Sequence, residues 1–237
     1  MTAKPIGIVV ARLDSRRLAS KALVDLGGRP LVRHVIDRAL RVPSLAGVAL
    51  ATTTRPLDEP LVDCARSAGI AVFRGSASNV AERLVACARH HQADFLVRLN
   101  ADSPFADPGL IEEGLQRLFA AKGVDLVSNL PGRTFPYGIS VEIVSVSTLE
   151  RILPTLSDEE AEHVTARFYG RPAEFRIERL VCPQPQLRHA RLVIDTEEDL
   201  ARVRDLVRRL GARAPTARFD EVARLALADD PHSLEPR

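Results

Sequence analysis

Short apolar runs alternate with amphipathic segments along most of the chain. The first run, residues 6–10, is rich in β-branched side chains, which is typical of a strand covered on both faces. The other predicted strands are residues 47–51, 70–73, 94–99, 124–128, 174–180 and 191–194. Because apolar positions recur at helical spacing between most of these runs, the pattern predicts an α/β fold.

Capping residues mark where several of the intervening helices begin. Ser78 or Asn79 is the expected cap of a helix that ends near His91. Asp107, followed by Pro108 at the first helical position, is the expected cap of the next helix. We therefore assign Asp107 a structural role.

The texture of the sequence changes in residues 131–146. Proline and glycine crowd the first half, and apolar and polar residues then alternate as in a strand with one buried face. We expect an inserted loop and small β segment that shapes the acceptor side of a cleft or makes a dimer contact. Residues 1–237 are expected to form a single domain, with residues 229–237 as a flexible tail.

Composition argues against several classes of protein. Of the 237 residues, 46% are hydrophobic, which is ample for a packed core. The 33 basic and 31 acidic residues leave a formal charge of +2, so bulk charge gives no case for nucleic-acid binding. The three cysteines are scattered, which argues against a disulfide framework or a zinc site. With no signal-peptide pattern and no apolar run of about 18 residues, we expect a cytoplasmic protein that does not enter a membrane.

A basic loop follows the first predicted strand. Its cationic residues are Arg12, Arg16, Arg17 and Lys21. Loops at the carboxyl ends of parallel strands line the crevice in which α/β sheets bind ligands, so this loop is placed to hold a phosphate-bearing ligand. A solvated loop without a ligand would show the same charges. The polar segment 75–79 is a second candidate wall of the ligand site.

Asp102 and Asp195 each lie just beyond a predicted buried strand. Carboxylates in such positions could meet across a cleft and supply oxygen ligands to one hard cation such as Mg²⁺. Taken alone, Asp102 could instead be a turn residue or a helix cap. Asp195 could be a capping partner for the helix that Thr196 and Asp199 begin.

His163 follows a segment in which Ser157 and Glu160 form a capping-box pattern, so it is expected on a helix. A lone histidine there is more often a satisfied surface or core residue than a ligand. Its role is therefore open on the residues alone.

A basic loop and two strand-end aspartates suit transfer of a nucleotidyl group. The cation would neutralise the triphosphate, and the loop would hold the β and γ phosphates as pyrophosphate departs. The loop has neither the G-x-x-x-x-G-K-[ST] nor the G-x-G-x-x-G pattern, which argues against a P-loop or a dinucleotide site. The chain also lacks a G-x-S-x-G elbow, and the proposed chemistry needs no protein nucleophile.

The chain resembles the spore coat polysaccharide biosynthesis protein F-like cytidylyltransferases, relatives of the synthetases of CMP-sialic acid and CMP-ketodeoxyoctonate. Five segments match the family in order over nearly the whole length. They are A-R-x-x-S-x-R-L-x-x-K from Ala11 to Lys21, R-L-x-x-D-x-P from Arg98 to Pro104, S-N at 128–129 with F-P-x-G-x-x-V-E from Phe135 to Glu142, E-H-V-T at 162–165, and D-T-x-E-D-L at 195–200.

The resemblance implies a Rossmann-like nucleotide-diphospho-sugar transferase fold of the GT-A-like kind, with a mostly parallel central sheet, helices on both faces and a small β insertion. It implies catalytic roles for Arg12, Lys21 and Asp102, and Mg²⁺ held by Asp102 and Asp195. The implied nucleotide contacts are Ala11, Arg12, Ser15, Arg17, Lys21, Asn79 and Arg83. The implied substrate contacts are Asn129, Tyr137, Glu142 and His163.

Four positions depart from the family pattern. Asp14 stands where relatives usually have glycine, and it would place a negative charge beside phosphates. Ala19 and Ser20 stand where a Pro-Gly pair is usual, and Ser140 where an acid is common. These departures bear on the nucleotide partner, the acceptor and the activity itself.

From the resemblance we expect a Mg²⁺-dependent cytidylyltransferase that joins CTP to a sugar acid or similar small acceptor and releases pyrophosphate. We also expect a homodimer. Two alternatives stay open: an enzyme on the same fold that transfers sugar from a nucleotide-sugar or uses another nucleotide, and a non-catalytic protein that only binds nucleotide.

Overall fold

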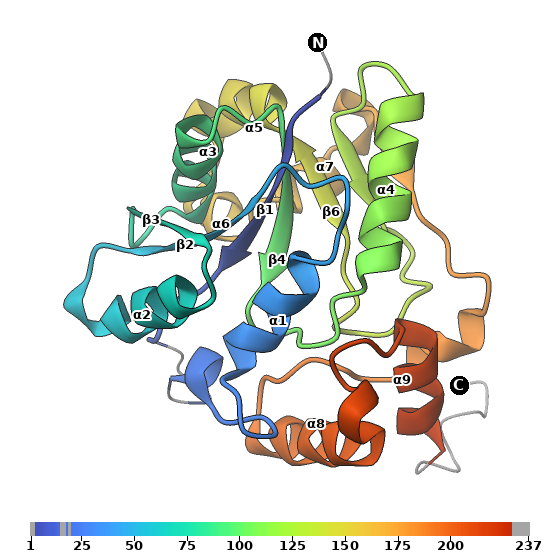
Figure 1. Ribbon diagram of the computed structural model, residues 1–237. Coiled ribbons are helices and arrows are strands. Elements are labelled where there is room, and N and C mark those ends of the chain that lie inside the picture. Colours follow the sequence, from blue (N-terminus) through green and yellow to red (C-terminus); the bar gives the residue numbers. More distant parts are fainter. Residues whose placement is uncertain (1–2, 15–17, 19, 229–237) are drawn as a thin grey trace.

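The apolar runs pair into one sheet. The computed structural model describes residues 3–14, 18 and 20–228. The strands are β1 Pro5–Val10, β2 Val48–Thr53, β3 Ala71–Gly75, β4 Phe95–Asn100, β5 Leu126–Ser128, β6 Glu142–Ser145 and β7 Ile177–Arg179. They form a seven-stranded sheet in the order β3-β2-β1-β4-β6-β5-β7, shown in Figure 1.

The sheet is mostly parallel, as the resemblance implied. β1 pairs in parallel with β2 and β4, and the pairs β2–β3 and β5–β7 are parallel as well. Among the described strands, β6 alone runs antiparallel to its neighbours. Because Val10 lies opposite Asn100 in the register, the loops after β1 and β4 leave the sheet at the same edge.

Apart from the helix at residues 146–152, which was not predicted, the helices lie close to their predicted positions. They are α1 Leu31–Ala39, α2 Glu59–Ser67, α3 Val80–His90, α4 Pro108–Ala120, α5 Val146–Ile152, α6 Asp158–Glu162, α7 Ala166–Gly170, α8 Glu197–Leu210 and α9 Phe219–Leu227. The predicted caps are confirmed: Asn79 caps α3, Asp107 caps α4, and Thr196 begins α8. The helix predicted to carry His163 is shorter than expected, because α6 ends at Glu162 and His163 leaves helical geometry.

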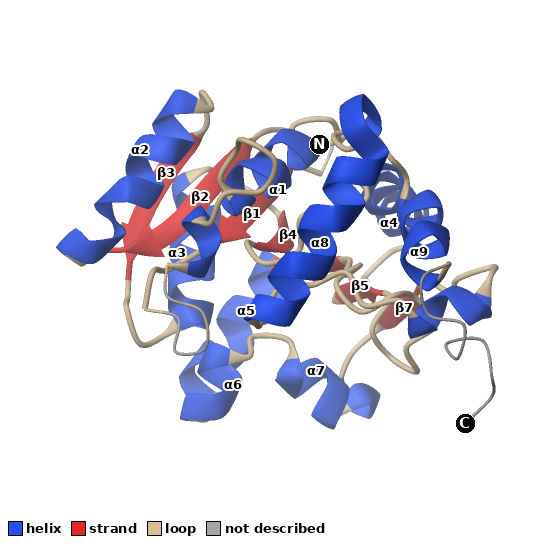
Figure 2. Cartoon of the chain, turned by 90° about the horizontal axis from the view of Figure 1, so that it is seen from below, coloured by secondary structure: helices blue, strands red, loops and turns tan. Residues whose placement is uncertain are grey.

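Two layers of helices cover the sheet (Figure 2). One apolar cluster joins a face of the sheet to α1, α2, α4, α8 and α9, and a second joins the other face to α3, α5 and α7. The alternation along β4 explains this division, since Val97 and Leu99 belong to the first cluster and Leu96 to the second. The prediction of helices on both faces is confirmed.

The prediction of a single buried face within 131–146 is wrong for β6. All four residues of this strand are buried, and both of its edges are paired inside the sheet. Two of its residues are polar because Glu142 belongs to a buried hydrogen-bond network and Ser145 caps α5. A second copy therefore has no free edge of β6 to pair with, and the homodimer stays a prediction.

Residues 191–194 do not form the predicted strand. They lie in an extended segment, residues 190–195, that makes one isolated bridge, between Tyr137 and Arg191. Its backbone is bound at three points, by Tyr137 N–H to the Ala190 carbonyl at 3.0 Å, by Leu192 N–H to the Tyr137 carbonyl at 2.6 Å, and by Ile194 N–H to the Asp102 carbonyl at 3.0 Å. The apolar side chains of this segment are buried in the core, but its backbone pairs with loops rather than with a neighbouring strand.

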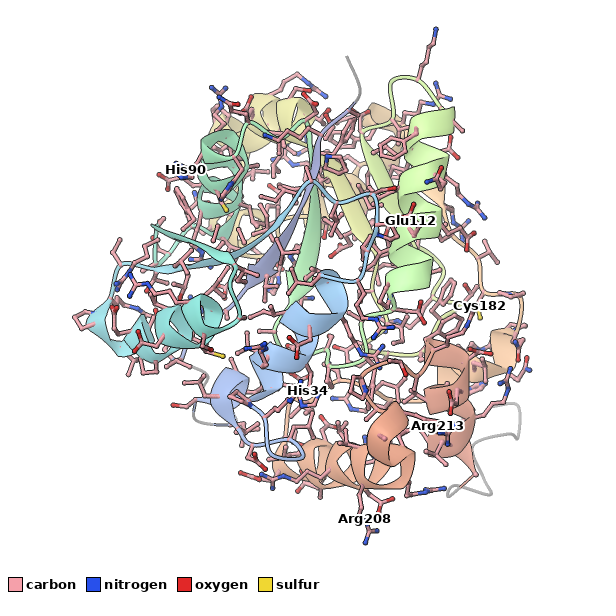
Figure 3. All side chains as sticks on the ribbon, in the orientation of Figure 1. His34, His90, Glu112, Cys182, Arg208 and Arg213 are labelled. Atoms are coloured by element: carbon pink, nitrogen blue, oxygen red, sulfur yellow. The ribbon has the colours of Figure 1, made fainter. Side chains whose placement is uncertain are left out.

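The three cysteines are free thiols, in agreement with the sequence. Cys87 and Cys182 are buried, and Cys182 is labelled in Figure 3. Within the described part of the chain, no helix is both long enough and apolar enough to cross a membrane.

Candidate active site

A cleft opens at the carboxyl ends of β1 and β4. It has a volume of about 740 Å³, and its walls include the loops after these strands and the facing ends of α3 and α6. Its cationic side chains are Arg12, Lys21, Arg83 and Arg98. Its carboxylates are Asp14, Asp102, Glu162 and Asp195. Such a charged cleft at a strand-end edge is where α/β sheets bind ligands.

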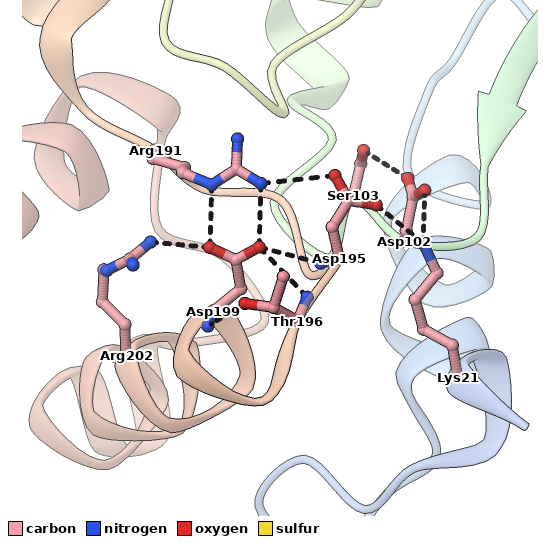
Figure 4. A network of polar contacts seen from close by, with 8 residues as sticks. All are labelled: Lys21, Asp102, Ser103, Arg191, Asp195, Thr196, Asp199 and Arg202. Carbon is pink, nitrogen blue, oxygen red and sulfur yellow. Dashed lines mark hydrogen bonds and ion pairs between the residues drawn. The ribbon is translucent and has the colours of Figure 1, made fainter. Parts of the chain in front are cut away.

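Lys21 joins the two predicted metal ligands (Figure 4). Its Nζ lies 2.9 Å from Asp102 Oδ2 and 3.0 Å from Asp195 Oδ1. Burial alone would lower the pKa of the Lys21 ammonium, but the carboxylates of Asp102 and Asp195 outweigh it and raise that pKa. The ammonium therefore stays charged between two carboxylates.

The two aspartates meet because the backbone brings them together. Asp102 follows β4, while Asp195 ends the extended segment 190–195, and the hydrogen bond from Ile194 N–H to the Asp102 carbonyl joins the two loops. Asp195 N–H in turn donates to Asp199 Oδ2 at 3.0 Å. The position of Asp195 is thus fixed from both sides.

Asp199 fills the capping role that Asp195 was also considered for. Thr196 and Asp199 form the reciprocal capping box of α8. Asp199 also accepts two hydrogen bonds from Arg191, at 2.7 and 2.8 Å, and one from Arg202 at 3.0 Å. Burial alone would raise the pKa of the Asp199 carboxyl. Hydrogen bonding, first from Arg191, outweighs this effect and holds the pKa well below its ordinary value. The side chain of Asp195 is therefore left to face Lys21 and the cleft.

Arg12 spans the mouth of the cleft. Its guanidinium lies 2.8 Å from Glu162 Oε1 on α6 and 3.1 Å from Asp14 Oδ1 on its own loop. It also donates to the Ala77 carbonyl, in the segment before α3, at 3.3 Å. One side chain from the β1 loop thus contacts both α6 and the segment before α3.

Asp14 does not face the cleft as an uncompensated charge. Arg55 Nη1 lies 2.7 Å from its Oδ2, and Arg12 binds its other oxygen. Hydrogen bonding by Arg55 is the main cause that lowers the pKa of Asp14. Sequence reasoning missed Arg55, because nothing local to residue 55 signals a partner in the β1 loop.

Arg83 is a buried cation in the wall formed by α3. It is 1% exposed, and its Nη1 donates to the Ser76 carbonyl. Its Nε is buried and has no hydrogen-bond partner. Burial, and then the charge of Arg12, lower the pKa of Arg83. A buried guanidinium with an unused donor favours an anionic or carbonyl-bearing ligand.

Asn79, another predicted nucleotide contact, does not line the cleft. Its side-chain oxygen accepts a hydrogen bond from Glu82 N–H at 2.8 Å, and its backbone N–H donates to Ser76 Oγ. The side chain is used to begin α3, so any contact of residue 79 with a nucleotide would have to involve other atoms.

Of the four predicted substrate contacts, His163 alone lines the cleft. Asn129 is buried, and its amide binds the backbone of Ile139 and Val141 at 2.8 and 2.9 Å. Tyr137 is 39% exposed and stacks between Arg133 and Arg191, whose guanidinium carbons lie 4.5 and 4.8 Å from its ring centroid. The geometry gives Asn129 a role in holding a loop rather than a ligand.

Glu142 also lies behind the cleft wall. It is 1% exposed and pairs with Arg98 at 2.7 Å, while it accepts hydrogen bonds from Thr165 and Tyr169. Arg98 itself lines the cleft, and its Nε is buried without a partner. Glu142 can therefore act on a ligand only through Arg98, which sequence reasoning matched to the family without assigning it a role.

The remaining predicted site residues either line the cleft or lie outside the described residues. Ala11, Arg12, Lys21, Arg83, Asp102 and Asp195 line the cleft. Ser15 and Arg17 lie outside the described residues.

The chemistry of the Asp102–Asp195 pair fits Mg²⁺. One oxygen of each carboxylate already binds a single cationic group, the Lys21 ammonium. Magnesium in nucleotide sites is commonly held by one or two carboxylates together with water and phosphate oxygens. Within the described residues, no group of three or more His, Cys, Asp and Glu side chains is placed to hold a metal ion.

Comparison with known proteins agrees with this geometry. A family model described as cytidylyltransferase matches residues 6–226. The spore coat polysaccharide biosynthesis protein SpsF of Bacillus subtilis is 32% identical over 216 residues, which are 87% of this chain and 87% of that protein. The residues that match extend from the first strand to the last described helix.

Two solved structures share the fold. A cytidylyltransferase from Leptospira borgpetersenii superposes with a TM-score of 0.91 at 22% identity and covers 100% of this chain and 98% of its own. A CMP:2-keto-3-deoxy-manno-octonic acid synthetase, solved with CTP, gives 0.66 at 20% identity, with 87% of this chain and 99% of that chain covered. The extent of the family match and the Bacillus subtilis relative establish that the chain belongs to the cytidylyltransferase family.

Proposed function

We propose that this protein is a Mg²⁺-dependent cytidylyltransferase that joins CTP to a sugar acid or a similar small acceptor and releases pyrophosphate. The observation that carries the proposal is the pair of strand-end carboxylates, Asp102 and Asp195, that converge on Lys21 beside Arg12. The family of the chain supports nucleotidyl transfer. The choice of CTP is supported by the family description and by the related synthetase that was solved with CTP.

The residues of the cleft would have different roles in such a reaction. Asp102 and Asp195 would hold Mg²⁺, which would neutralise phosphate charge when bound. Arg12 and Lys21 would bind phosphate oxygens, where developing negative charge is stabilised by cations already in place. The acceptor oxygen would attack the α-phosphorus in line with the departing pyrophosphate. No protein nucleophile takes part.

The basic side chains of the cleft come from different elements. Arg83 lies on α3, while Arg98 and His163 come from β4 and the end of α6. We assign the nucleotide to the wall that carries Arg83 and the acceptor to the wall that carries Arg98 and His163. An acid as acceptor agrees with the Nε donor of Arg98, which is buried without a partner in the protein.

A non-catalytic role loses its main argument in this geometry. That alternative rested on Asp14 as a negative charge beside the phosphates. Because Arg55 and Arg12 bind both oxygens of Asp14, the charge is compensated within the protein. No described contact favours transfer of sugar from a nucleotide-sugar.

Substitution of the two aspartates tests this function. Asp102→Asn and Asp195→Asn keep the size of the side chains but remove the carboxylate charge, so we expect pyrophosphate release to fall by about a hundredfold or more. The measurement is a pyrophosphate-release assay with CTP, UTP, ATP and GTP, Mg²⁺ and a panel of sugar acids. Asp205→Asn is the matched control, since Asp205 pairs with Arg208 on α8 away from the cleft. Unchanged activity of both cleft variants would overturn the assignment.

A further inference from the structure

We propose that Lys21 occupies the place of the metal ion while the site is free, and that metal entry displaces its ammonium toward the phosphates. Metal binding and the release of a phosphate-binding cation would then be one coupled event. The inference rests on the proposed function for the identity of the ligands. It concerns a step that precedes the chemistry.

The geometry of the pair is that of a shared cation. The Nζ atom of Lys21 lies 2.9 Å from one carboxylate and 3.0 Å from the other, and the Lys21 side chain is only 18% exposed. Asp102 and Asp195 come from loops that are far apart in sequence but meet at this point. A positive charge between the two partly buried carboxylates offsets their repulsion.

The other oxygen of each aspartate is already engaged. Asp102 Oδ1 accepts a hydrogen bond from Ser103 at 3.0 Å, and Asp195 Oδ2 lies 3.3 Å from Arg191 Nη2. The oxygens that bind Lys21 are therefore the ones that both carboxylates present to a common point. A metal ion that uses the same two oxygens must take the place of the ammonium.

The two cations cannot share this place. Magnesium binds oxygen at about 2.0–2.1 Å, so an ion held by both carboxylates would lie within a few ångströms of an ammonium at its present position. Two like charges so close repel strongly in a partly buried site. Entry of the metal is thus expected to break both Lys21 contacts.

Lys21 has a short route to a new partner. Its ammonium is carried on a flexible four-carbon stem, and the side chain lines the same cleft as Arg12. Arg12 is likewise held by carboxylates, those of Asp14 and Glu162. A metal-bound triphosphate supplies what both rearrangements require, a cation for the aspartates and anionic oxygens for the released side chains. The exchange predicts weak metal binding without nucleotide and cooperative binding with it.

Metal affinity of the free protein tests the exchange. We expect Lys21→Met, which keeps the stem but removes the charge, to bind Mn²⁺ about tenfold tighter or more than the unaltered protein, measured by electron paramagnetic resonance without nucleotide. Lys122→Met is the control, because Lys122 is exposed near the end of α4. Equal or weaker Mn²⁺ binding by the Lys21 variant would overturn the inference, provided that its circular dichroism spectrum is native.

A second measurement uses the unaltered protein and so does not depend on the folding of a variant. The chain has three lysines, Lys4, Lys21 and Lys122, so covalent labelling of each can be followed by mass spectrometry. We expect Mg²⁺ to increase the labelling of Lys21 and to leave Lys122 unchanged. Labelling of Lys21 that does not respond to Mg²⁺ would contradict the exchange.

The outcomes separate this inference from the proposed function. Tighter Mn²⁺ binding by Lys21→Met, with no pyrophosphate release from any nucleotide by the unaltered protein, would support the exchange and overturn the function. Pyrophosphate release by the unaltered protein, with no gain in metal affinity for the variant, would support the function and overturn the exchange.

Discussion

At the scale of single residues, the charges of this site are meaningful only in pairs. Asp14 considered alone is a liability beside phosphates, but Arg55 and Arg12 compensate it. Ser20 shows a similar contrast, because its φ of 50° is the left-handed conformation that suits the glycine usual in relatives. The sequence shows the departure at both positions, whereas the compensation of Asp14 and the left-handed backbone of Ser20 are visible only in three dimensions.

Removing Arg55 should expose the charge of Asp14. We expect Arg55→Met to weaken CTP binding by about threefold to tenfold, because the carboxylate would then repel the phosphates. Isothermal titration calorimetry with Mg²⁺ and CTP measures the change. Arg66→Met, which alters an exposed arginine on α2, should have no such effect.

A second substitution separates the charge effect from local disturbance, since Arg55 also contacts Thr53 and Asp58. Asp14→Gly in the Arg55→Met background should restore the affinity for CTP. If the double variant binds as weakly as Arg55→Met, repulsion by Asp14 is not the cause.

At the scale of elements, local patterns predicted what local forces decide. The caps Asn79, Asp107 and Thr196 were predicted from adjacent residues, because a capping bond spans only a few positions. Residues 191–194 do not form the strand that their pattern predicts, since apolar residues indicate burial but do not say whether the backbone pairs with a strand or with loops. The buried position of Glu142 was not predicted either, because its partners Arg98 and Tyr169 are distant in sequence.

The contact between Gly138 and the extended segment should be decisive for the site. Gly138 has a φ of 101°, and a Cβ there would lie 2.6 Å from Val193 N. We expect Gly138→Ala to push residues 190–195 outward, which would separate Asp195 from Asp102. The expected loss of stability is about 2 kcal/mol or more, measured by urea unfolding, together with weaker Mn²⁺ binding.

Gly123→Ala provides the comparison that isolates the clash. Gly123 also has a positive φ, 68°, but no atom lies within 4 Å of the place of its Cβ. Both variants therefore carry backbone strain, and only the one at Gly138 adds a collision. Equal effects of the two substitutions on stability and on metal binding would show that the segment tolerates the methyl group.

At the scale of the whole molecule, a buried arginine in the layer of helices behind the sheet ties the loop after Asp102 to the connection between α8 and α9. Arg38 of α1 is 2% exposed and donates to three backbone carbonyls, those of Ala106 at 3.3 Å, Ala214 at 2.7 Å and Ala217 at 3.0 Å. Ala106 follows Asp102 in the loop before α4, and the other two carbonyls lie in the connection between α8 and α9. Asp107 adds a further tie, because its side chain caps α4 and accepts Phe219 N–H at 2.7 Å.

Local patterns predicted the α/β fold and the convergence of Asp102 and Asp195, but they did not predict the buried contacts of Arg38. Arg38 lies in an amphipathic helix where a basic residue is ordinarily solvated. Its burial depends on loops far along the chain that enclose it. Burial lowers the pKa of Arg38 to about 10, so the guanidinium stays protonated at neutral pH and keeps all of its donors.

Loss of the Arg38 hydrogen bonds should therefore lower both the stability of the protein and the metal affinity of the site. Arg38→Leu leaves three buried carbonyls without their donors, so we expect the free energy of unfolding to fall by about 2–4 kcal/mol. Because the loop that carries Asp102 and the connection that follows α8 would then be less firmly tied to α1, Mn²⁺ affinity should fall as well. Arg41→Leu changes an exposed arginine just beyond the same helix and is the control. If urea unfolding and Mn²⁺ titration give the same values for both variants, the burial of Arg38 does not position the site.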